Sequence, residues 1–236
     1  EIIQEFVQPT GWSSVDTAEE IHQKLELAGI NLSDDSSCCV ATGYGRISVP
    51  YADKTVTEIT CHALGAVHLF QQPDLTVIDI GGQDTKIIQI EQGFVKDFIM
   101  NDKCAAGTGR FLEVMANTLS LRPNEMFDLA RLGSDTTISS MCTVFAESEV
   151  IGLIGKGEPK ENIAYAVVNS TIRKVAAQVS RMNGEMSTFC LTGGLCECEY
   201  IREALSKELG KEVISCPDAR YAGAIGAALS AMKIRK

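Results

Sequence analysis

Residues 75–86, with the sequence LTVIDIGGQDTK, decide the fold class of this chain. The apolar run 75–82 predicts a short buried strand, and Gly81 and Gly82 break it two residues after Asp79. Glycines allow backbone N–H groups to approach phosphate oxygens closely. A carboxylate at the end of a strand suits Mg²⁺, which prefers oxygen ligands. The stretch therefore predicts a phosphate-binding loop, and an ordinary hairpin turn is the alternative.

Each polar residue of this loop has an expected role. We expect Asp79 to take part in catalysis and to hold Mg²⁺ through water. Gln83 and Asp84 are expected to position the attacking water, and Asp84 is also expected to bind nucleotide. Gly81 and Gly82 are the expected phosphate contacts.

Two further glycine turns occur at strand ends. LTGG (191–194) closes a buried run, and its Gly193 and Gly194 are expected to line the adenine or ribose of a nucleotide. TGYGR (42–46) is the other turn and brings a cation, Arg46. Three such turns in this order resemble the two-lobed ATPase architecture of actin, the sugar kinases and the Hsp70 chaperones. That fold begins with a first phosphate loop of the form DxGS/T on an opening hairpin, and this chain shows neither, so we expect its first N-terminal hairpin to be missing.

The rest of the chain alternates between strand and helix patterns, which predicts an α/β fold. Strands are expected over 38–44, 75–82, 187–194 and 210–218, and a hairpin over 85–100. Helices are expected over 55–70, 105–119, from Pro123 to before Gly133, and over 143–154, 163–182, 200–209 and 222–232. We expect one lobe from 1–76 with 218–236, truncated at its N-terminus, and a second lobe from 77–217 that carries the helices next to the cysteines.

The composition excludes some classes of protein. The chain has 236 residues and a formal net charge of −10, with scattered Lys and Arg, so a nucleic-acid partner is not expected. No apolar run reaches the roughly 18 residues that a membrane span needs. We expect a cytoplasmic protein. Its nine irregularly spaced cysteines do not indicate a disulfide framework, and the CxC pair Cys196 and Cys198 is a weak metal pattern.

Two cysteines, Cys104 and Cys142, have matched surroundings, because each stands directly before a predicted helix. Helix N-termini expose unpaired N–H groups and favour bound anions. A thiolate-ligated iron–sulfur cluster is anionic, but a four-iron cluster takes four cysteines, which a two-fold dimer would supply. A catalytic cysteine and simple packing are the alternatives. Gly107 and Gly109, which follow Cys104, are included among the expected cofactor-binding residues.

Five motifs together resemble the activator family of the 2-hydroxyacyl-CoA dehydratases, the BadF/BadG/BcrA/BcrD type, which includes the ATPase subunits of benzoyl-CoA reductase. They are MNDKCAAGTGRF (100–111), MCTVFAESEV (141–150), ATGYGR (41–46), ADKTVTEITCHALGA (52–66) and DIGGQDTK (79–86). The resemblance runs over essentially the whole chain. It implies a homodimer that holds one [4Fe–4S] cluster between its subunits, with Cys104 and Cys142 of each subunit as ligands.

The resemblance also implies the reaction. ATP binding and hydrolysis, with Mg²⁺ and with ADP as product, would drive an electron from reduced ferredoxin or flavodoxin through the cluster to an acyl-CoA dehydratase or reductase. Two alternatives stay open at this point. One is a sugar-kinase-like phosphotransferase of the same fold, and the other is a truncated dimer that does not hydrolyse ATP.

Overall fold

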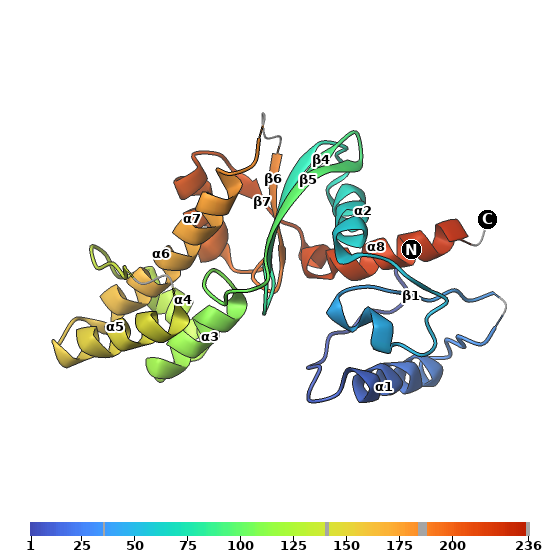
Figure 1. Cartoon of the computed structure of the whole chain (residues 1–236), viewed down its shortest axis with the longest axis horizontal. Coiled ribbons are helices and arrows are strands. Elements are labelled where there is room, and N and C mark those ends of the chain that lie inside the picture. Colours follow the sequence, from blue (N-terminus) through green and yellow to red (C-terminus); the bar gives the residue numbers. More distant parts are fainter. Residues whose placement is uncertain (35, 140–141, 184–187, 235–236) are drawn as a thin grey trace. The chain divides into compact units, whose positions relative to one another are not determined.

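The computed structural model describes residues 1–34, 36–139, 142–183 and 188–234 (Figure 1). The chain divides into two compact units, Glu1–Gly65 with Gly223–Lys236, and Ala66–Ala222. The division into lobes 1–76 with 218–236 and 77–217 stays a prediction. None of the described helices combines the length and apolar composition that crossing a membrane needs.

A five-stranded sheet forms the centre of the unit Ala66–Ala222. Its strand order is β5-β4-β3-β6-β7. Strands β3, β4 and β5 form an antiparallel meander, whereas β6 and β7 continue from β3 in parallel. Every residue of β3 is buried, as its apolar sequence predicts. The strands are β3 (Leu75–Ile80), β4 (Thr85–Glu91), β5 (Phe94–Asn101), β6 (Thr188–Gly193) and β7 (Val213–Ile214).

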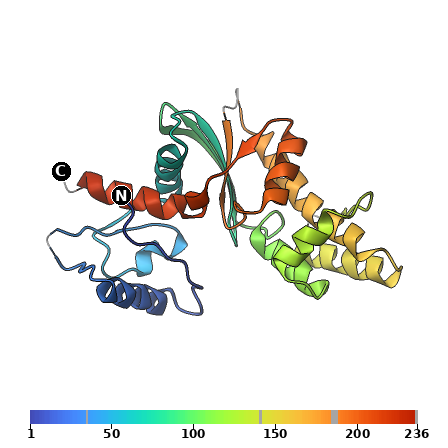
Figure 2. The same cartoon turned by 180° about the vertical axis from the view of Figure 1, so that it is seen from behind.

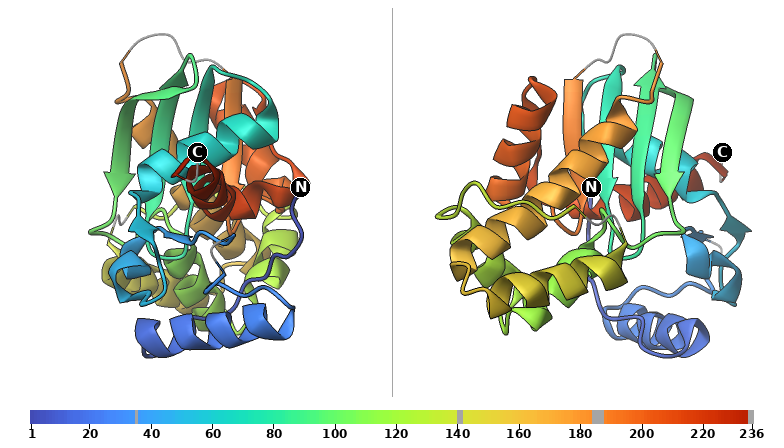
Figure 3. Two further views of the ribbon diagram at one scale, coloured as in Figure 1. Left: turned by 90° about the vertical axis from the view of Figure 1, so that its right-hand side faces the viewer. Right: turned by 60° about the vertical axis from the view of Figure 1, so that its left-hand side comes forward.

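Five helices of this unit share one hydrophobic core with the sheet. Ile78, Ile80 and Ile87 of the sheet belong to the same buried cluster as apolar residues of all five helices. The longest helix, α6, crosses in front of the sheet in the right-hand view of Figure 3. The helices are α3 (Gly109–Thr118), α4 (Pro123–Ala130), α5 (Thr143–Gly155), α6 (Lys160–Val179) and α7 (Glu199–Leu209), followed by the 3₁₀ helix η2 (Pro217–Tyr221).

The other unit contains short strands and helices (Figure 2). They are α1 (Ser14–Leu27), β1 (Val40–Ala41), η1 (Tyr44–Ser48), β2 (Lys54–Thr55), the first part of α2 (Glu58–Phe70) and nearly all of α8 (Ala222–Ile234). A Cβ on Gly226 would lie 1.6 Å from the carbonyl oxygen of Cys61. Only glycine therefore fits at this point, where α8 packs closely against α2.

Some expected elements differ from those found in the first 70 residues. Helix α1 was not expected, although Ser13 caps it by accepting a hydrogen bond from the backbone N–H of Asp16. The strand expected over 38–44 is only the two-residue β1, and 3₁₀ turns follow it. The helix expected from 55 begins at Glu58, because Lys54 and Thr55 pair with β1 as a strand.

The helix expected over 105–119 begins only at Gly109, so the expectation that a helix follows Cys104 directly is wrong. Gly107 has φ +88°, a left-handed conformation, and Thr108 is extended, so the helix cannot start earlier. Cys104 therefore lies in a loop and not directly before a helix. Cys142 does stand directly before α5, as expected. Met141 and Ser187, at the starts of an expected motif and an expected strand, lie outside the described residues.

Candidate functional site

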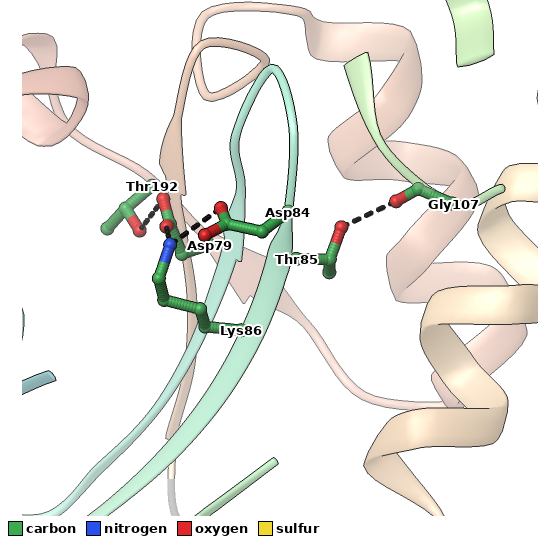
Figure 4. Close-up of polar contacts among 6 residues, drawn as sticks. All are labelled: Asp79, Asp84, Thr85, Lys86, Gly107 and Thr192. Carbon is green, nitrogen blue, oxygen red and sulfur yellow. Dashed lines mark hydrogen bonds and ion pairs between the residues drawn. The ribbon is translucent and has the colours of Figure 1, made fainter. Parts of the chain in front are cut away.

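Three polar residues form a row across the sheet at the end where the glycine loops begin. The register places Asp79 of β3 opposite Lys86 of β4 and opposite Thr192 of β6. Directly opposed residues project from the same face of a sheet, so their side chains meet. The Lys86 Nζ atom lies 3.2 Å from Asp79 Oδ2, and the Thr192 hydroxyl donates to Asp79 Oδ1 at 3.2 Å (Figure 4). Strand pairing therefore holds Asp79 from both sides.

Asp84 completes this row as a second carboxylate. Its Oδ1 lies 2.7 Å from Lys86 Nζ, so one ammonium contacts two carboxylates (Figure 4). Asp79, Asp84 and Lys86 are each no more than 5% exposed. Buried charges persist only when paired, which explains why Lys86 accompanies the two acids. We call Asp79, Asp84, Lys86 and Thr192 the polar row.

The expectations from sequence missed Lys86 and Thr192 as site residues. A signal for Lys86 was present, because Asp84 and Lys86 are two residues apart at the start of a strand and so share a face. Nothing local in LTGG indicates that Thr192 contacts Asp79, since that contact depends on a parallel register between strands 113 residues apart.

The glycines of both predicted turns come against the polar row. A Cβ on Gly81 would lie 2.8 Å from Asp84 Oδ1, and one on Gly193, which has φ +82°, would lie 2.5 Å from Asp79 Oδ1. Gly82 and Gly194 differ, because they are exposed and a Cβ on either would meet nothing within 4 Å. Gly81 and Gly193 thus shape the site, whereas the backbone of Gly82 and Gly194 faces open space that a ligand can occupy.

Gln83 is exposed and lines an open depression of about 570 Å³. The expected phosphate loop and the Cys104 loop share this depression. Its lining residues are Gly82, Gln83, Asp102, Lys103, Cys104, Ala105, Arg110 and Glu113. The structure therefore brings together two motifs that are about twenty residues apart and that the sequence had assigned to separate chemistry.

Backbone hydrogen bonds join these two loops. The N–H of Gly109 donates to the carbonyl of Gly81 at 2.9 Å, and the N–H of Arg110 donates to the carbonyl of Gly82 at 2.8 Å. A Cβ on Gly109 would lie 3.2 Å from the Gly81 oxygen, so the close approach favours glycine. Gly107 and Gly109 thus shape the Cys104 loop, and their contact with a cofactor stays a prediction.

A second depression, of about 480 Å³, lies beside the LTGG turn and is lined by Gly194. Arg131 and Tyr200 also line it, and the guanidinium carbon of Arg131 lies 5.3 Å from the centre of the Tyr200 ring. Tyr200 is held by its hydroxyl, which donates to the Ala130 carbonyl. Flat and polar groups around a concave surface are typical of sites for planar ligands.

Cys104 and Cys142 differ in exposure. Cys104 is half-buried in its loop, whereas Cys142 is exposed at the N-cap of α5. Neither cysteine forms a disulfide bond with another described residue. Among the described residues, no three His, Cys, Asp or Glu side chains gather into a metal site. One chain therefore offers two thiols at most to a four-cysteine cluster, and the donor set fits such a cluster only with a second copy.

The polar row fits Mg²⁺ in a limited way. Asp79 and Asp84 are suitable oxygen donors, but the Lys86 ammonium contacts both carboxylates. A cation held through water, as expected for Asp79, fits this arrangement better than direct chelation by both acids.

The CxC pair is unsuited to metal binding in this fold. Burial raises the pKa of the Cys196 thiol to about 11, and burial also raises the pKa of Cys198. The thiolate is the form that binds metals. The weak metal pattern at this pair is therefore better explained by packing.

Curated relatives are similar to the chain over nearly its whole length. The (R)-2-hydroxyglutaryl-CoA dehydratase activating ATPase of Acidaminococcus fermentans is 44% identical over 99% of this chain and 89% of its own length. The activator of lactoyl-CoA dehydratase of Anaerotignum propionicum is 40% identical over 98% of this chain and 89% of its own.

Solved structures agree with these relatives. Component A of (R)-2-hydroxyglutaryl-CoA dehydratase from A. fermentans has a TM-score of 0.86 at 42% identity, covering 96% of this chain and 87% of its own. The activator of 2-hydroxyisocaproyl-CoA dehydratase from Clostridium difficile, with bound ADPNP, has a TM-score of 0.83 at 34% identity, covering 100% and 85%. These matches confirm the expected α/β ATPase fold of the actin and Hsp70 type. Residues 4–231 match one family in particular, and the chain belongs to it: the BadF/BadG/BcrA/BcrD ATPase family.

Proposed function

We propose that this protein uses ATP to drive one-electron transfer to an acyl-CoA dehydratase or reductase. The observation that carries the proposal is the depression shared by the phosphate loop and Cys104, with Gly82 and Gln83 beside the thiol. A sugar-kinase-like phosphotransferase has no use for a thiol at that place. The names of the relatives, which are activators of 2-hydroxyacyl-CoA dehydratases, support the same reaction.

The nucleotide would bind along the two glycine turns. The exposed backbone of Gly82 accepts close approach of phosphate oxygens, and the LTGG turn with Arg131 and Tyr200 takes the nucleoside. Asp79 would hold the water shell of Mg²⁺, and Gln83, which lines the open depression, would orient the attacking water. Lys86 would neutralise the buried charge of Asp79 and Asp84 when nucleotide and cation are bound and when they are released.

Cys104 and Cys142 would hold a [4Fe–4S] cluster together with the same residues of a second copy. Such a cluster supplies low-potential one-electron chemistry when bound. Helix α5, whose N-cap is Cys142, carries exposed apolar side chains, namely Val144 (67% exposed), Phe145 (68%) and Ile151 (56%). This apolar surface continues directly from a proposed ligand, and it is suited to a self-complementary two-fold interface.

The electron donor would be a small reduced carrier such as ferredoxin or flavodoxin. The acceptor would be the acyl-CoA enzyme, reached from the same exposed side as Cys142. Both partners belong to the proposal, as does the cytoplasmic, anaerobic setting that a partly exposed cluster requires.

Anaerobic assays test the proposed function. Protein purified without oxygen should contain iron and sulfide, hydrolyse ATP, and activate a 2-hydroxyacyl-CoA dehydratase only when ATP and a low-potential reductant are both present. A metal-free anaerobic preparation would contradict the electron-transfer role. Iron and sulfide without ATP hydrolysis would support the alternative of a non-hydrolysing dimer.

A further inference from the structure

Two neighbouring side chains hold the loop that carries Cys104. Thr85 of β4 and Asn101 of β5 are direct cross-strand partners. The Thr85 hydroxyl donates to the carbonyl of Gly107 at 2.6 Å (Figure 4). The Asn101 amide donates to the carbonyls of Cys104 at 2.8 Å and Ala106 at 3.0 Å. One position on the sheet therefore fixes three of the four carbonyls in the segment 104–107.

The same loop is attached to the phosphate loop on its other side. The amides of Gly109 and Arg110 donate to the carbonyls of Gly81 and Gly82, as described above. Thr85 is itself the residue directly after Asp84 of the polar row, and it is completely buried. The segment 104–110 is thus hydrogen-bonded to the phosphate loop at its end and to the first residue of β4 near its middle.

We propose that Thr85 and Asn101 are positioning residues that transmit the nucleotide state to Cys104. The inference rests on the proposed function, because it requires nucleotide at Gly81 and Gly82. A phosphate group that moves those two residues also moves the carbonyls that anchor Gly109 and Arg110. The hydrogen bonds from Thr85 and Asn101 hold the residues between Cys104 and Gly109 in place. These residues therefore cannot adjust independently, and the backbone at Cys104 moves with the phosphate loop. Discrete switching of this kind needs a tightly packed, fully hydrogen-bonded segment rather than a slack loop.

The alternative is that the two side chains only stabilise the loop. Stability and transmission differ in one respect, because a stabilising role is the same with and without nucleotide. The test must therefore compare nucleotide states within each variant.

Hydrogen exchange followed by mass spectrometry measures this directly on the full chain, purified anaerobically. Wild-type protein is compared without nucleotide, with ADP and with a non-hydrolysable ATP analogue. We expect the analogue to slow exchange in 80–84 and also to change exchange in 102–110. Thr85→Val, which removes the hydroxyl at nearly constant shape, should keep the change in 80–84 and lose the change in 102–110. Thr85→Ser should restore it.

A second variant guards against a Thr85→Val protein that does not fold. Asn101→Asp keeps the shape but removes the two N–H donors, and it should uncouple 102–110 in the same way. A wild-type response in 80–84 without one in 102–110 would overturn the inference and leave the proposed ATPase function standing. The same would follow if both variants kept the wild-type response in 102–110. No response in either segment of the wild type would overturn the nucleotide site as well.

Discussion

The polar row is a complete site within one chain, whereas the two cysteines are proposed to be only part of a site. Asp79, Asp84 and Lys86 are buried, and the structure gives each a partner within 3.2 Å. Cys104 is half-buried and Cys142 is exposed. A buried and charged site must be satisfied inside one fold, because an unpaired buried charge is costly. An exposed pair of thiols beside an apolar helix face is instead typical of a site completed by another molecule.

The largest effect is expected from removing a proposed cluster ligand, which should separate iron binding from ATP binding. Cys142→Ser should abolish iron binding while ATP binding persists, because the polar row does not involve that side chain. Anaerobic iron and sulfide analysis measures the first, and calorimetric titration with ATP the second. Cys198→Ser is the matched control, since Cys198 also occupies a helix N-cap, at α7. Equal iron content in both variants would show that Cys142 is not a ligand.

Removing the ammonium from the polar row should cost stability. Lys86→Met leaves Asp79 and Asp84 buried without their shared cation, so we expect a loss of about 3–5 kcal/mol in the free energy of unfolding. Urea unfolding of the apoprotein measures it. Lys96→Met is the control on the same hairpin, because the Lys96–Glu91 pair is about half exposed and should contribute about 1 kcal/mol or less. A similar loss of unfolding free energy in the two variants would contradict the claim that burial makes the Lys86 ion pairs the stronger ones.

The two glycines of LTGG should respond differently to alanine. Gly193→Ala puts a methyl group 2.5 Å from Asp79 Oδ1 at a residue with φ +82°, so we expect a destabilisation of about 1–3 kcal/mol and weaker nucleotide binding. At Gly194 the added Cβ meets nothing within 4 Å. Gly194→Ala should therefore retain stability, and any effect on ATP affinity would report contact with the ligand. Thermal unfolding with and without ATP separates the effect on stability from the effect on ATP binding. Equal destabilisation of the Gly193→Ala and Gly194→Ala proteins would argue against the observed turn.

Thiol reactivity should show the smallest effect. Burial raises the pKa of Cys196 to about 11, so at pH 8 its thiolate fraction is below that of an ordinary thiol, and it grows only as the pH rises toward 11. In protein freed of iron, iodoacetamide should modify the exposed Cys142 well before Cys196. Peptide mass mapping over time measures the order. Faster modification of Cys196 at pH 8 would mean that the 3₁₀ and loop segments around it open readily.

Part of this organisation was predictable from the chain alone. LTVIDIGG predicts β3 and its glycine loop because a continuous apolar run ended by glycines has few other solutions. Cys104 and Cys142 stood apart by their surroundings. Thr192 was not assigned, because its role depends on which residues face each other across β3 and β6, whereas Lys86 was missed although its spacing from Asp84 was a signal. The start of α3 was placed too early, since small residues in 105–108 permit a helix, whereas the left-handed Gly107 and the extended Thr108 prevent it.

The central claim is that two copies of this chain share one cluster. Native mass spectrometry of anaerobically purified protein, with iron and sulfide analysis of the same sample, tests it most directly. The account predicts a dimer with about four irons and four sulfides per two chains, and a Cys104→Ser dimer without them. A monomer that retains its own cluster, or a dimer without iron, would contradict it.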